Sequence, residues 1–320
     1  MNRTFESLAS TLFRYAKLLK QKAEQKGKMA TIRIVILKPL CWGILRCSPK
    51  TRVFDHAYHF TCFLKNHGRL PRESRMYNDM LYRILTTHEI RNPLRTFISD
   101  KEHLKQYVKA TLGDSFNVRT FAVLKSPEEV DNYTFLNACV AKPTHGCGQV
   151  LIIEEPFNHF IDRKLIKSWF HFNIYDNCRQ ENYKNLLPKI MIEELLPLSH
   201  GMDEYKVFCI HGQPRAIIHS RGFKETTKVR FYDRQWNTLD IKLLPSNDPL
   251  PPSPAPNNLE AMIDAASILS APFDFIRVDL YSDGERCLVS ELTNCSAGAS
   301  RRFASGHEEV LSRLLFKTDK

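Results

Sequence analysis

The sequence predicts an α+β fold whose sheets are built from antiparallel hairpins rather than from regular strand–helix–strand crossovers. Strand-like runs follow each other closely at 205–210 and 214–219, and again at 275–281 and 286–292. The last two are separated by a segment that contains Asp283-Gly284, a typical hairpin turn. Hydrophobic residues make up 43% and charged residues 25% of the 320 residues, which is ordinary for a globular chain with room for two or three lobes.

The first 54 residues form a basic segment with amphipathic character. Leu8, Leu12, Tyr15 and Leu19 recur at helical spacing among lysines and arginines, which predicts a basic amphipathic helix. The apolar run 32–42 is too short, and too interrupted by basic residues, to span a bilayer. Two interpretations stay open: the segment lies on a membrane surface, or it forms a helix and a strand packed on the body. Residues 1–28 lack the apolar core and cleavage site of a signal peptide.

The net charge indicates which kind of partner the protein binds, and the cysteine pattern indicates its cellular compartment. The formal net charge is +11, so an anionic partner is expected: a nucleotide, a membrane surface, an acidic polymer or nucleic acid. Basic tails alone are the alternative explanation. No motif with base-stacking aromatics supports nucleic-acid binding. The nine cysteines show no zinc-type spacing and several lie in apolar runs, which favours a reduced, cytoplasmic protein.

The remaining elements follow from periodicity and from turn residues. Helices are expected over 55–92, 101–112, a short stretch from Pro127, 164–172, and from Asn257 or Asn258 to about Leu269. Strands are expected at 96–99, 121–124, 138–142, 150–153, 189–194, 205–210, 214–219, 275–281 and 286–292. The run Pro249–Pro256 forbids helix and central strand, so it is expected to be an extended surface connection.

A lysine followed by a glycine-containing loop is the first candidate site motif. Lys142 ends a buried strand, and Gly146 and Gly148 follow within six residues. Glycines let backbone N–H groups approach a phosphate closely, and the lysine adds a positive charge. The Gly-Lys-Ser/Thr order of a Walker A loop is absent. A plain hairpin turn is the alternative interpretation.

Two acids, Glu193 and Glu194, end the apolar strand 189–194 and form the second motif. Such a segment can line a slot for adenine, with a carboxylate close to the ribose or to the base amine. Solvated acids at the end of a strand are the alternative.

The third motif places three charged groups on one face of a hairpin. Alternation puts Arg277, Asp279 and Tyr281 on one side of their strand, and Glu291 lies on the next strand. Carboxylates on two adjacent strands can hold Mg²⁺. The arginine can stabilise charge that develops on a transferring phosphoryl or acyl group. The alternative is an ion pair between Arg277 and either acid.

The order of these motifs resembles that of the ATP-grasp superfamily. They are Ser99-Asp100-Lys101, Ala141-Lys142-Pro143 with its glycines, Ile192-Glu193-Glu194, Arg277-Val278-Asp279, and Glu291-Leu292-Thr293-Asn294. More narrowly, the chain is similar from about His67 to about Phe303 to the TupA-like ATP-grasp family, associated with teichuronopeptide and other surface-polysaccharide synthesis. The resemblance implies two α+β lobes that grip ATP, after an N-terminal helical segment. The expected division is a basic N-terminal segment at 1–54, a helical and αβ lobe at 55–125, and nucleotide-binding and catalytic lobes at 126–320.

The resemblance also implies roles for individual residues. Lys101 and Lys142 contact the nucleotide phosphates, which the loop with Gly146 and Gly148 covers. Arg277 stabilises the acyl phosphate and the tetrahedral intermediate. The adenine and ribose hinge and the Mg²⁺ site complete the set: Glu193, Glu194, Leu195 and Leu196 for the hinge, and Asp279 and Glu291 for the metal. Many ATP-grasp enzymes have Glu-x-Asn as the last metal motif. Here Thr293 holds that third position and Asn294 follows, so the third ligand is open between these two.

The implied activity is that of an ATP- and Mg²⁺-dependent carboxylate–amine ligase. The expected product is an amide between an amino acid and a uronic-acid-containing capsular or other cell-surface polysaccharide. The expected location is cytoplasmic, with possible contact of the N-terminal helix with the inner face of the membrane. The alternatives are a glycosyl- or phosphoryl-transferase of glycan assembly, and a non-enzymatic membrane-associated protein with a degenerate nucleotide site.

Overall fold

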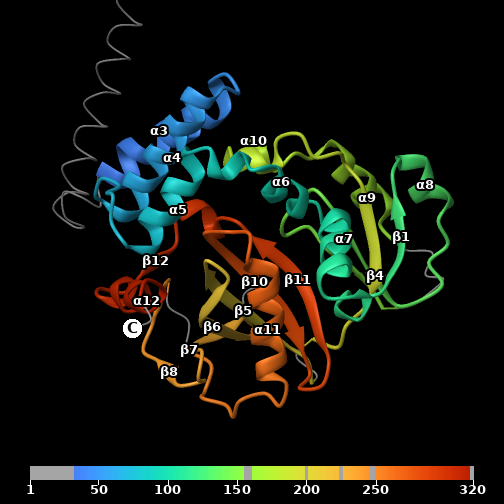
Figure 1. Ribbon diagram of the computed structural model, residues 1–320. Coiled ribbons are helices and arrows are strands. Elements are labelled where there is room, and N and C mark those ends of the chain that lie inside the picture. The colour runs from blue at the N-terminus through green and yellow to red at the C-terminus, as the bar shows by residue number, and fades with distance from the viewer. Residues whose placement is uncertain (1–31, 155–160, 199–200, 223–225, 246–248, 318–320) are drawn as a thin grey trace, which may run out of the picture. The chain divides into compact units, whose positions relative to one another are not determined.

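A computed structural model describes residues 32–154, 161–198, 201–222, 226–245 and 249–317 (Figure 1). The chain divides into two compact units, residues 1–72 and 73–320, and each is described by itself. The amphipathic helix expected within residues 1–28 lies outside the described residues. The three-part division expected from the sequence stays a prediction.

The described part of the first unit is helical. A π-helical turn, Arg33–Leu37, leads into α3 (Lys38–Cys47), and α4 (Arg52–His67) follows. One of the two open interpretations included a strand in this segment, and the structure has helix there instead: α3 begins at Lys38, with Pro39 in its first turn. Gly68 ends α4 in the left-handed conformation (φ 66°). None of the described helices has the length and apolar character needed to cross a bilayer.

The second unit begins with helices, the last of which starts at Lys101. They are α5 (Tyr77–Thr86), a 3-10 turn (Glu89–Arg91), α6 (Pro93–Ser99) and α7 (Lys101–Thr111). The strand expected at 96–99 is wrong. The Asn92 side chain accepts a hydrogen bond from the Leu94 N–H at 2.9 Å, and Pro93 occupies the first helical turn, so a helix starts there. Asp100 then caps α7 by accepting from the backbone N–H groups of Glu102 and His103.

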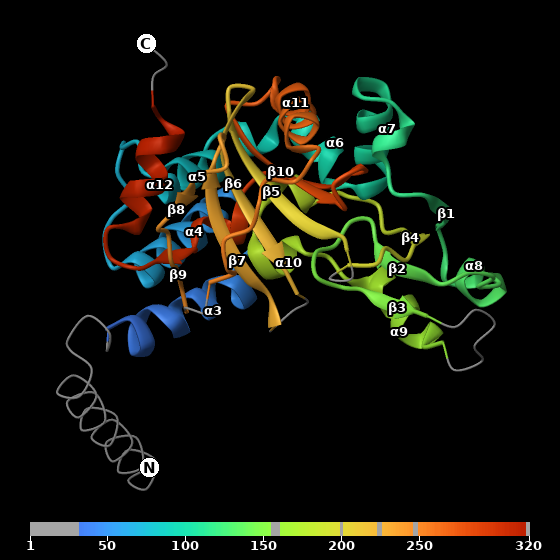
Figure 2. The ribbon, with the colours of Figure 1, turned by 90° about the horizontal axis from the view of Figure 1, so that it is seen from below.

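A four-stranded antiparallel sheet has the order β1-β4-β2-β3. Its strands are β1 (Thr120–Leu124), β2 (Cys139–Pro143), β3 (Leu151–Ile153) and β4 (Ile190–Glu194), all close to the predicted ranges. Two short helices, α8 (Pro127–Asn132) and α9 (Arg163–Ser168, continued by a 3-10 turn at Trp169–His171), belong to this part of the chain (Figure 2). The side chains of Val130 and Ile166 pack with Ile190 and Ile192 in one apolar cluster.

A six-stranded antiparallel sheet has the order β11-β10-β5-β6-β7-β8. Its strands are β5 (Asp203–Ile210), β6 (Gln213–Arg221), β7 (Lys228–Asp233), β8 (Thr238–Leu239), β10 (Phe275–Ser282) and β11 (Cys287–Thr293). Helix α11 (Leu259–Ser270) packs against one face (Figure 1), where Ile276, Val278 and Leu280 join its apolar side chains in the main core. The opposite face is left to Arg277, Asp279 and Tyr281, as the alternation predicts.

Helix α11 starts at the expected place but without the expected cap. Asn258 occupies the N-cap position, yet its side chain makes no capping hydrogen bond. It accepts instead from the Ser282 hydroxyl at 2.9 Å and donates to the Arg286 carbonyl at 3.0 Å. Asn258 therefore fastens the start of α11 to the turn of the β10–β11 hairpin.

A β-bulge interrupts the β10–β11 pairing. Asp279 pairs with Glu291, but the next residue, Leu280, pairs with Val289, so Ser290 is an extra residue on β11. The extra residue shifts the alternation of β11. Glu291 therefore lies beside Asp279 on one side of the bulge, while Leu288 lies opposite Tyr281 on the other.

The remaining elements are short. They are a helical turn α10 (Tyr175–Cys178), 3-10 turns at Asp114–Phe116, Glu181–Tyr183 and Ser296–Ala299, the two-stranded pair β9 (Leu243–Leu244) and β12 (Arg302–Phe303), and the terminal helix α12 (His307–Leu315). The described residues of Pro249–Pro256 are extended, as predicted. Ser253 anchors this run: its carbonyl accepts from Trp236 Nε1 at 2.9 Å, and its N–H donates to the Tyr232 hydroxyl at 3.1 Å.

Candidate functional site

A cavity of about 810 Å³ is lined by residues of both sheets. Strands β2, β3 and β4 supply one wall, and β10 and β11 with the start of α7 supply the other. The lining residues are Lys101, Val118, Val140, Lys142, Gly148, Gln149, Val150, Ile152, Glu154, Glu193, Glu194, Leu195, Leu196, Pro197, Leu198, Glu204, Tyr281, Ser290 and Glu291.

Eight of the residues predicted from the sequence line this cavity: Lys101, Lys142, Gly148, Glu193, Glu194, Leu195, Leu196 and Glu291. Five others do not line it, namely Gly146, Arg277, Asp279, Thr293 and Asn294. Gly146 is nevertheless close, because its carbonyl accepts a hydrogen bond from the Lys101 ammonium. Motifs that are separated by up to 190 residues in the sequence thus meet at one place.

Lys142 and Lys105 share one buried carboxylate, Glu193. Lys105 Nζ lies 2.7 Å from Glu193 Oε1, and the Lys142 ammonium pairs with Oε2 of the same group. Burial opposes ionisation of Glu193, but the two ammonium groups outweigh it and lower the pKa of the carboxyl below its ordinary value. Burial also works against the charge on Lys142, yet Glu193 raises the pKa of this lysine. Lys142 is therefore cationic at neutral pH, as phosphate binding requires.

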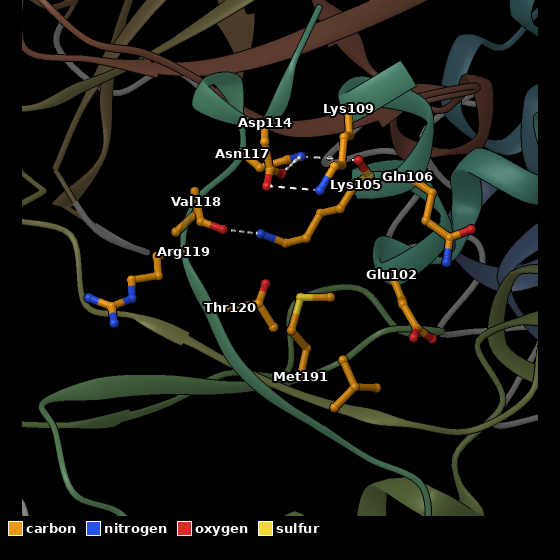
Figure 3. Close-up of a pocket in the computed structure, with 11 residues that line it drawn as sticks. Glu102, Lys105, Gln106, Lys109, Asp114, Asn117, Val118, Arg119, Thr120 and Met191 are labelled. Carbon is orange, nitrogen blue, oxygen red and sulfur yellow. Dashed lines mark hydrogen bonds and ion pairs between the residues drawn. The ribbon is translucent and has the colours of Figure 1, made fainter. Parts of the chain in front are cut away.

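Lys105 lines a groove next to the cavity described above. This groove, of about 480 Å³, has Lys105, Lys109, Asp114 and Val118 among its lining residues (Figure 3). In this view the Lys105 ammonium donates to the Val118 carbonyl, while Lys109 pairs with Asp114. Val118 lines the groove and the larger cavity alike. The Lys105 side chain therefore lines the groove, and its ammonium group forms an ion pair with Glu193.

Asp100 determines the position of Lys101. This buried carboxylate caps α7, accepts from the Thr144 hydroxyl at 2.8 Å, and pairs with Lys189 at 3.2 Å. It thereby ties the start of α7 to the loop after β2 and to the residue before β4. Burial lowers the pKa of Lys101, and the Glu291 carboxylate opposes that shift. Lys101 and Glu291 thus influence each other electrostatically across the cavity.

The segment after β4 forms an apolar end of the cavity. The Glu194 N–H donates to the Arg119 carbonyl at 2.9 Å, which fixes the end of the strand. Leu196 packs with Val118, Met202 and Leu288, and Tyr281 packs against this cluster. Apolar walls of this kind are typical of small-molecule sites.

Asp279 and Glu291 lie side by side across β10 and β11. Asp279 pairs in register with Glu291 on one side and with Lys206 of β5 on the other. Arg277 makes a bidentate contact with the Asp279 carboxylate at 2.7 and 2.6 Å. The alternative predicted from the sequence, an Arg277–Asp279 ion pair, is thus present. It does not involve Glu291, whose carboxylate has no hydrogen bond or ion pair among the described residues.

These two carboxylates fit a Mg²⁺ ion. The ion prefers carboxylate and phosphate oxygens and keeps several waters, so two adjacent acids at a cavity that is also lined by Lys101 and Lys142 are a sufficient protein contribution. Glu291 has no hydrogen-bond or ion-pair partner in the part of the chain that the structure describes, and it lines the cavity, as such a ligand must. The Asp279 carboxylate can supply the second oxygen ligand while it also accepts the two hydrogen bonds from Arg277.

Asn294 lies away from this pair. It is 2% exposed, its Oδ1 accepts from Arg95 Nη1 at 3.0 Å, and its Nδ2 donates to Ser99 Oγ at 3.2 Å. Thr293 pairs in register with Arg277, and its hydroxyl accepts from Arg277 Nη2 at 3.1 Å. Of the two candidates for the third ligand, Thr293 is on the face of the acids and Asn294 is on the face of the helices.

Two substitutions separate these candidates. Asn294→Ala is expected to lower the free energy of unfolding by roughly 1–3 kcal/mol, because it removes one acceptor of the buried Arg95, whose other partners are the Phe275 carbonyl and Glu89. It is expected to leave the Mg²⁺ concentration for half-maximal turnover unchanged. Thr293→Val is expected to raise that concentration by about tenfold. Urea unfolding and ADP release against Mg²⁺ measure the two effects, and the reverse pattern would assign the ligand to Asn294.

Several residues of the site were missed by the sequence reasoning. Glu204 and Ser290 line the cavity, and Lys105 holds Glu193. Alternation along β5 could have found Glu204, since Tyr205 and Val207 on the other face belong to the core. No local signal indicates Lys105, because its partner lies 88 residues further along the chain.

Comparisons with known proteins agree with this architecture. The model of the family described as TupA-like ATPgrasp matches residues 79–315, which is most of the chain. This chain belongs to the TupA-like ATP-grasp family. The family and the ATP-grasp fold expected from the sequence are thereby confirmed.

Solved structures with a similar arrangement are ATP-grasp ligases of low identity. The ligase PsnB with a minimal precursor, Mg and ADP is 16% identical, with 62% of this chain and 50% of that chain covered and a TM-score of 0.34. D-alanine–D-alanine ligase from Bacillus anthracis with ATP is 15% identical, with 62% of this chain and 56% of that chain covered and a TM-score of 0.36. D-cycloserine synthetase DcsG is 16% identical, with 70% of this chain and 72% of that chain covered and a TM-score of 0.36. This TupA-like chain spans about half the length of the PsnB chains it matches. No curated protein matches it in sequence.

Proposed function

We propose that this TupA-like ATP-grasp protein is an ATP- and Mg²⁺-dependent carboxylate–amine ligase. One observation supports the proposal most directly: two lysines, Lys101 and Lys142, and the acid Glu291 line one cavity, and Asp279 is paired with Glu291 at its edge. The lysines can then bind phosphates and the carboxylates can bind a divalent ion at the same place, as phosphoryl transfer requires.

ATP would lie with its base against the apolar end of the cavity. Glu193, Glu194, Leu195 and Leu196 form the hinge around adenine and ribose, and Lys101 and Lys142 bind the phosphates. Gly146 and Gly148 let the loop after β2 come close to those phosphates. Asp279 and Glu291 would hold Mg²⁺, together with Thr293 in preference to Asn294, and the ion would supply neutralisation of the phosphate charge.

The reaction has two steps. A carboxylate oxygen of the acceptor attacks the γ-phosphorus of ATP, the bond to the bridging oxygen breaks, and ADP leaves. The amine of the second substrate then attacks the acyl carbon, phosphate leaves, and the amine gives up a proton. Arg277 stabilises the negative charge that develops in both steps, because its guanidinium is held beside the two acids by bonds to Asp279 and to the Ser296 hydroxyl.

The substrates proposed are an amino acid and an acidic glycan, such as a uronic-acid-containing capsular or other cell-surface polysaccharide. The net charge of +11 supports an acidic acceptor. The basic amphipathic pattern of residues 1–28 supports work at the inner face of a membrane, where lipid-linked glycans are assembled. We propose a cytoplasmic location with peripheral membrane contact on the same basis.

Dependence of ADP release on both substrates tests the ligase proposal. The purified protein is incubated with ATP, Mg²⁺, a uronic-acid oligosaccharide and a mixture of amino acids, and ADP and new amide products are measured. ADP release that requires both a carboxylate and an amine supports the ligase. Transfer of phosphate or of a sugar to the glycan, without amide formation, would favour a transferase of glycan assembly instead.

A further inference from the structure

A second cavity, of about 450 Å³, lies on the same face of the six-stranded sheet as the acids. It is lined by strands β5, β6, β7 and β10 and by the segments that carry β9 and β12. Its lining residues include Lys206, Phe208, Phe231, Lys242, Arg277 and Arg301.

The strand register joins this cavity to the nucleotide cavity. Across β5, β10 and β11, Lys206 lies beside Asp279, and Asp279 lies beside Glu291. In the opposite direction Lys206 lies beside Ile218 of β6, and Ile218 beside Phe231 of β7. One row of side chains thus runs from the metal-binding acids into the second cavity. Glu204 lines both cavities.

The floor of the second cavity is aromatic. Tyr77 makes edge contacts with Phe208 and Phe303, with ring centroids 5.6 and 6.0 Å apart, and Phe208 stacks with Phe231 at 6.5 Å. Apolar residues of β6 and β7 extend this floor. Such a surface takes the apolar face of a ring and excludes water from it.

The rim of the cavity carries unbalanced positive charge. Arg277 is neutralised by Asp279, and Lys206 by Glu204 at 2.5 Å. Lys242 and Arg301 also line the cavity and are exposed, but neither has a carboxylate partner among the described residues. Two cations without a counter-ion, above an aromatic floor, indicate an anionic ligand with an apolar ring face.

We infer that the second cavity binds an acidic saccharide through two of its acid groups. One carboxylate is presented to Arg277 at the edge shared with the nucleotide cavity, and a second acid group on a neighbouring sugar is bound by Lys242 and Arg301. The ring faces pack on the half-buried Val229, Leu243 and Phe303, which lie over the buried aromatic floor. This assignment rests on the proposed ligase function, and it adds the requirement that the acceptor is an oligomer with at least two acids.

The volume of the cavity agrees with this substrate class. Pockets of about 300–1,000 Å³ hold small organic ligands, so a single acetate-like acid would leave most of the space to water. A carboxylate bound at Arg277 alone would also leave Lys242 and Arg301 unused. Both arguments favour a ligand that extends from the reacting edge to the rim.

Direct binding separates this inference from the activity. The protein, saturated with ADP and Mg²⁺, is titrated by calorimetry with trigalacturonate, with the neutral trisaccharide maltotriose and with the peptide triglutamate. We expect trigalacturonate to bind and maltotriose not to bind. Lys242→Gln and Arg301→Gln are each expected to weaken the binding of trigalacturonate by about tenfold. Arg302→Gln is the matched control, because this neighbouring arginine does not line the cavity.

Hydroxylamine trapping gives the second readout. An acyl phosphate formed from trigalacturonate and ATP reacts with hydroxylamine to a hydroxamate and phosphate, so no amino acid has to be known. Galacturonate itself is the matched substrate with one acid. Lys242→Gln and Arg301→Gln are expected to raise the KM for trigalacturonate by about tenfold and to leave the KM values for galacturonate and for ATP unchanged.

The outcomes separate the two proposals. Failure of the wild-type protein to bind trigalacturonate, tighter binding of triglutamate, or equal binding by both variants and the wild type each overturns the assignment of the cavity. Binding that depends on Lys242 and Arg301, without any hydroxamate, overturns the ligase function and supports the cavity as a saccharide site. Hydroxamate formation with unchanged KM in both variants supports the ligase and overturns the cavity.

Discussion

Glu291→Gln is expected to lower ADP release at saturating Mg²⁺ by at least about 10²–10³-fold. Glutamine keeps the shape of the side chain but removes the negative charge that holds the ion beside the phosphates. Because Glu291 has no hydrogen-bond or ion-pair partner among the described residues, the free energy of unfolding is expected to stay the same. ADP release and urea unfolding measure the two quantities.

Asp279→Asn is expected to reduce turnover to the same extent but also to destabilise the protein. Asp279 is 2% exposed and neutralises the buried Arg277, and removal of one partner of a buried pair costs roughly 3–5 kcal/mol. Asp283→Asn is the matched control in the same hairpin. Asp283 pairs with Arg286 in the turn, so turnover is expected to change little. Turnover near that of the wild type in both Glu291→Gln and Asp279→Asn would contradict the proposed metal site.

Glu193→Gln is expected to lower the free energy of unfolding by roughly 3–5 kcal/mol. The substitution leaves two largely buried ammonium groups, on Lys105 and Lys142, without their shared counter-ion. The KM for ATP is expected to rise, because the two cations repel each other and Lys142 moves from its place at the phosphates. Urea unfolding and steady-state kinetics measure these effects. Glu194→Gln, which breaks no ion pair among the described residues, is the control for the unfolding measurement.

The pH dependence of stability gives the same pair a second test. The pKa of Glu193 is lowered in the folded protein, so its ionised form stabilises the fold at pH values above the ordinary glutamate pKa. This contribution is lost as the pH falls through the lowered, folded-state pKa. The wild type is therefore expected to lose stability on acidification more steeply than Glu193→Gln. Parallel curves for the two proteins would show that Glu193 is not an ionised partner of the lysines.

The sequence predicted the site best where one strand carries the information. The alternation of Arg277, Asp279 and Tyr281 against an apolar face is a local property of β10, and the structure has it as predicted. The side-chain partners of Asn294 and of Lys105 could not be predicted from local alternation. Asn294 is held by Arg95, 199 residues away, and Lys105 by Glu193, so both depend on the packing of helices on the sheets.

Errors in the fold prediction have a common physical origin. Residues 96–99 have strand-like composition, but Asn92 and Pro93 start a helix a few residues earlier and outweigh that propensity. Asn258 has the right residue type for a cap, but Ser282 and Arg286 offer its side chain other partners. In both cases hydrogen bonds outside the segment decided its structure.

The extra residue Ser290 has a consequence for how this gene can change. Leu288 and Glu291 are three positions apart, yet both stand opposite β10 residues of the site face, because the bulge absorbs one position. Loss of the codon would remove the bulge, and Glu291 would still pair with Asp279 on the same face, because regular alternation would then run from Leu288 through Val289 to Glu291. Over evolutionary time the two acids therefore tolerate the loss of one residue at this point. Such a loss would instead change the local twist of the hairpin and the part of the cavity wall that Ser290 supplies.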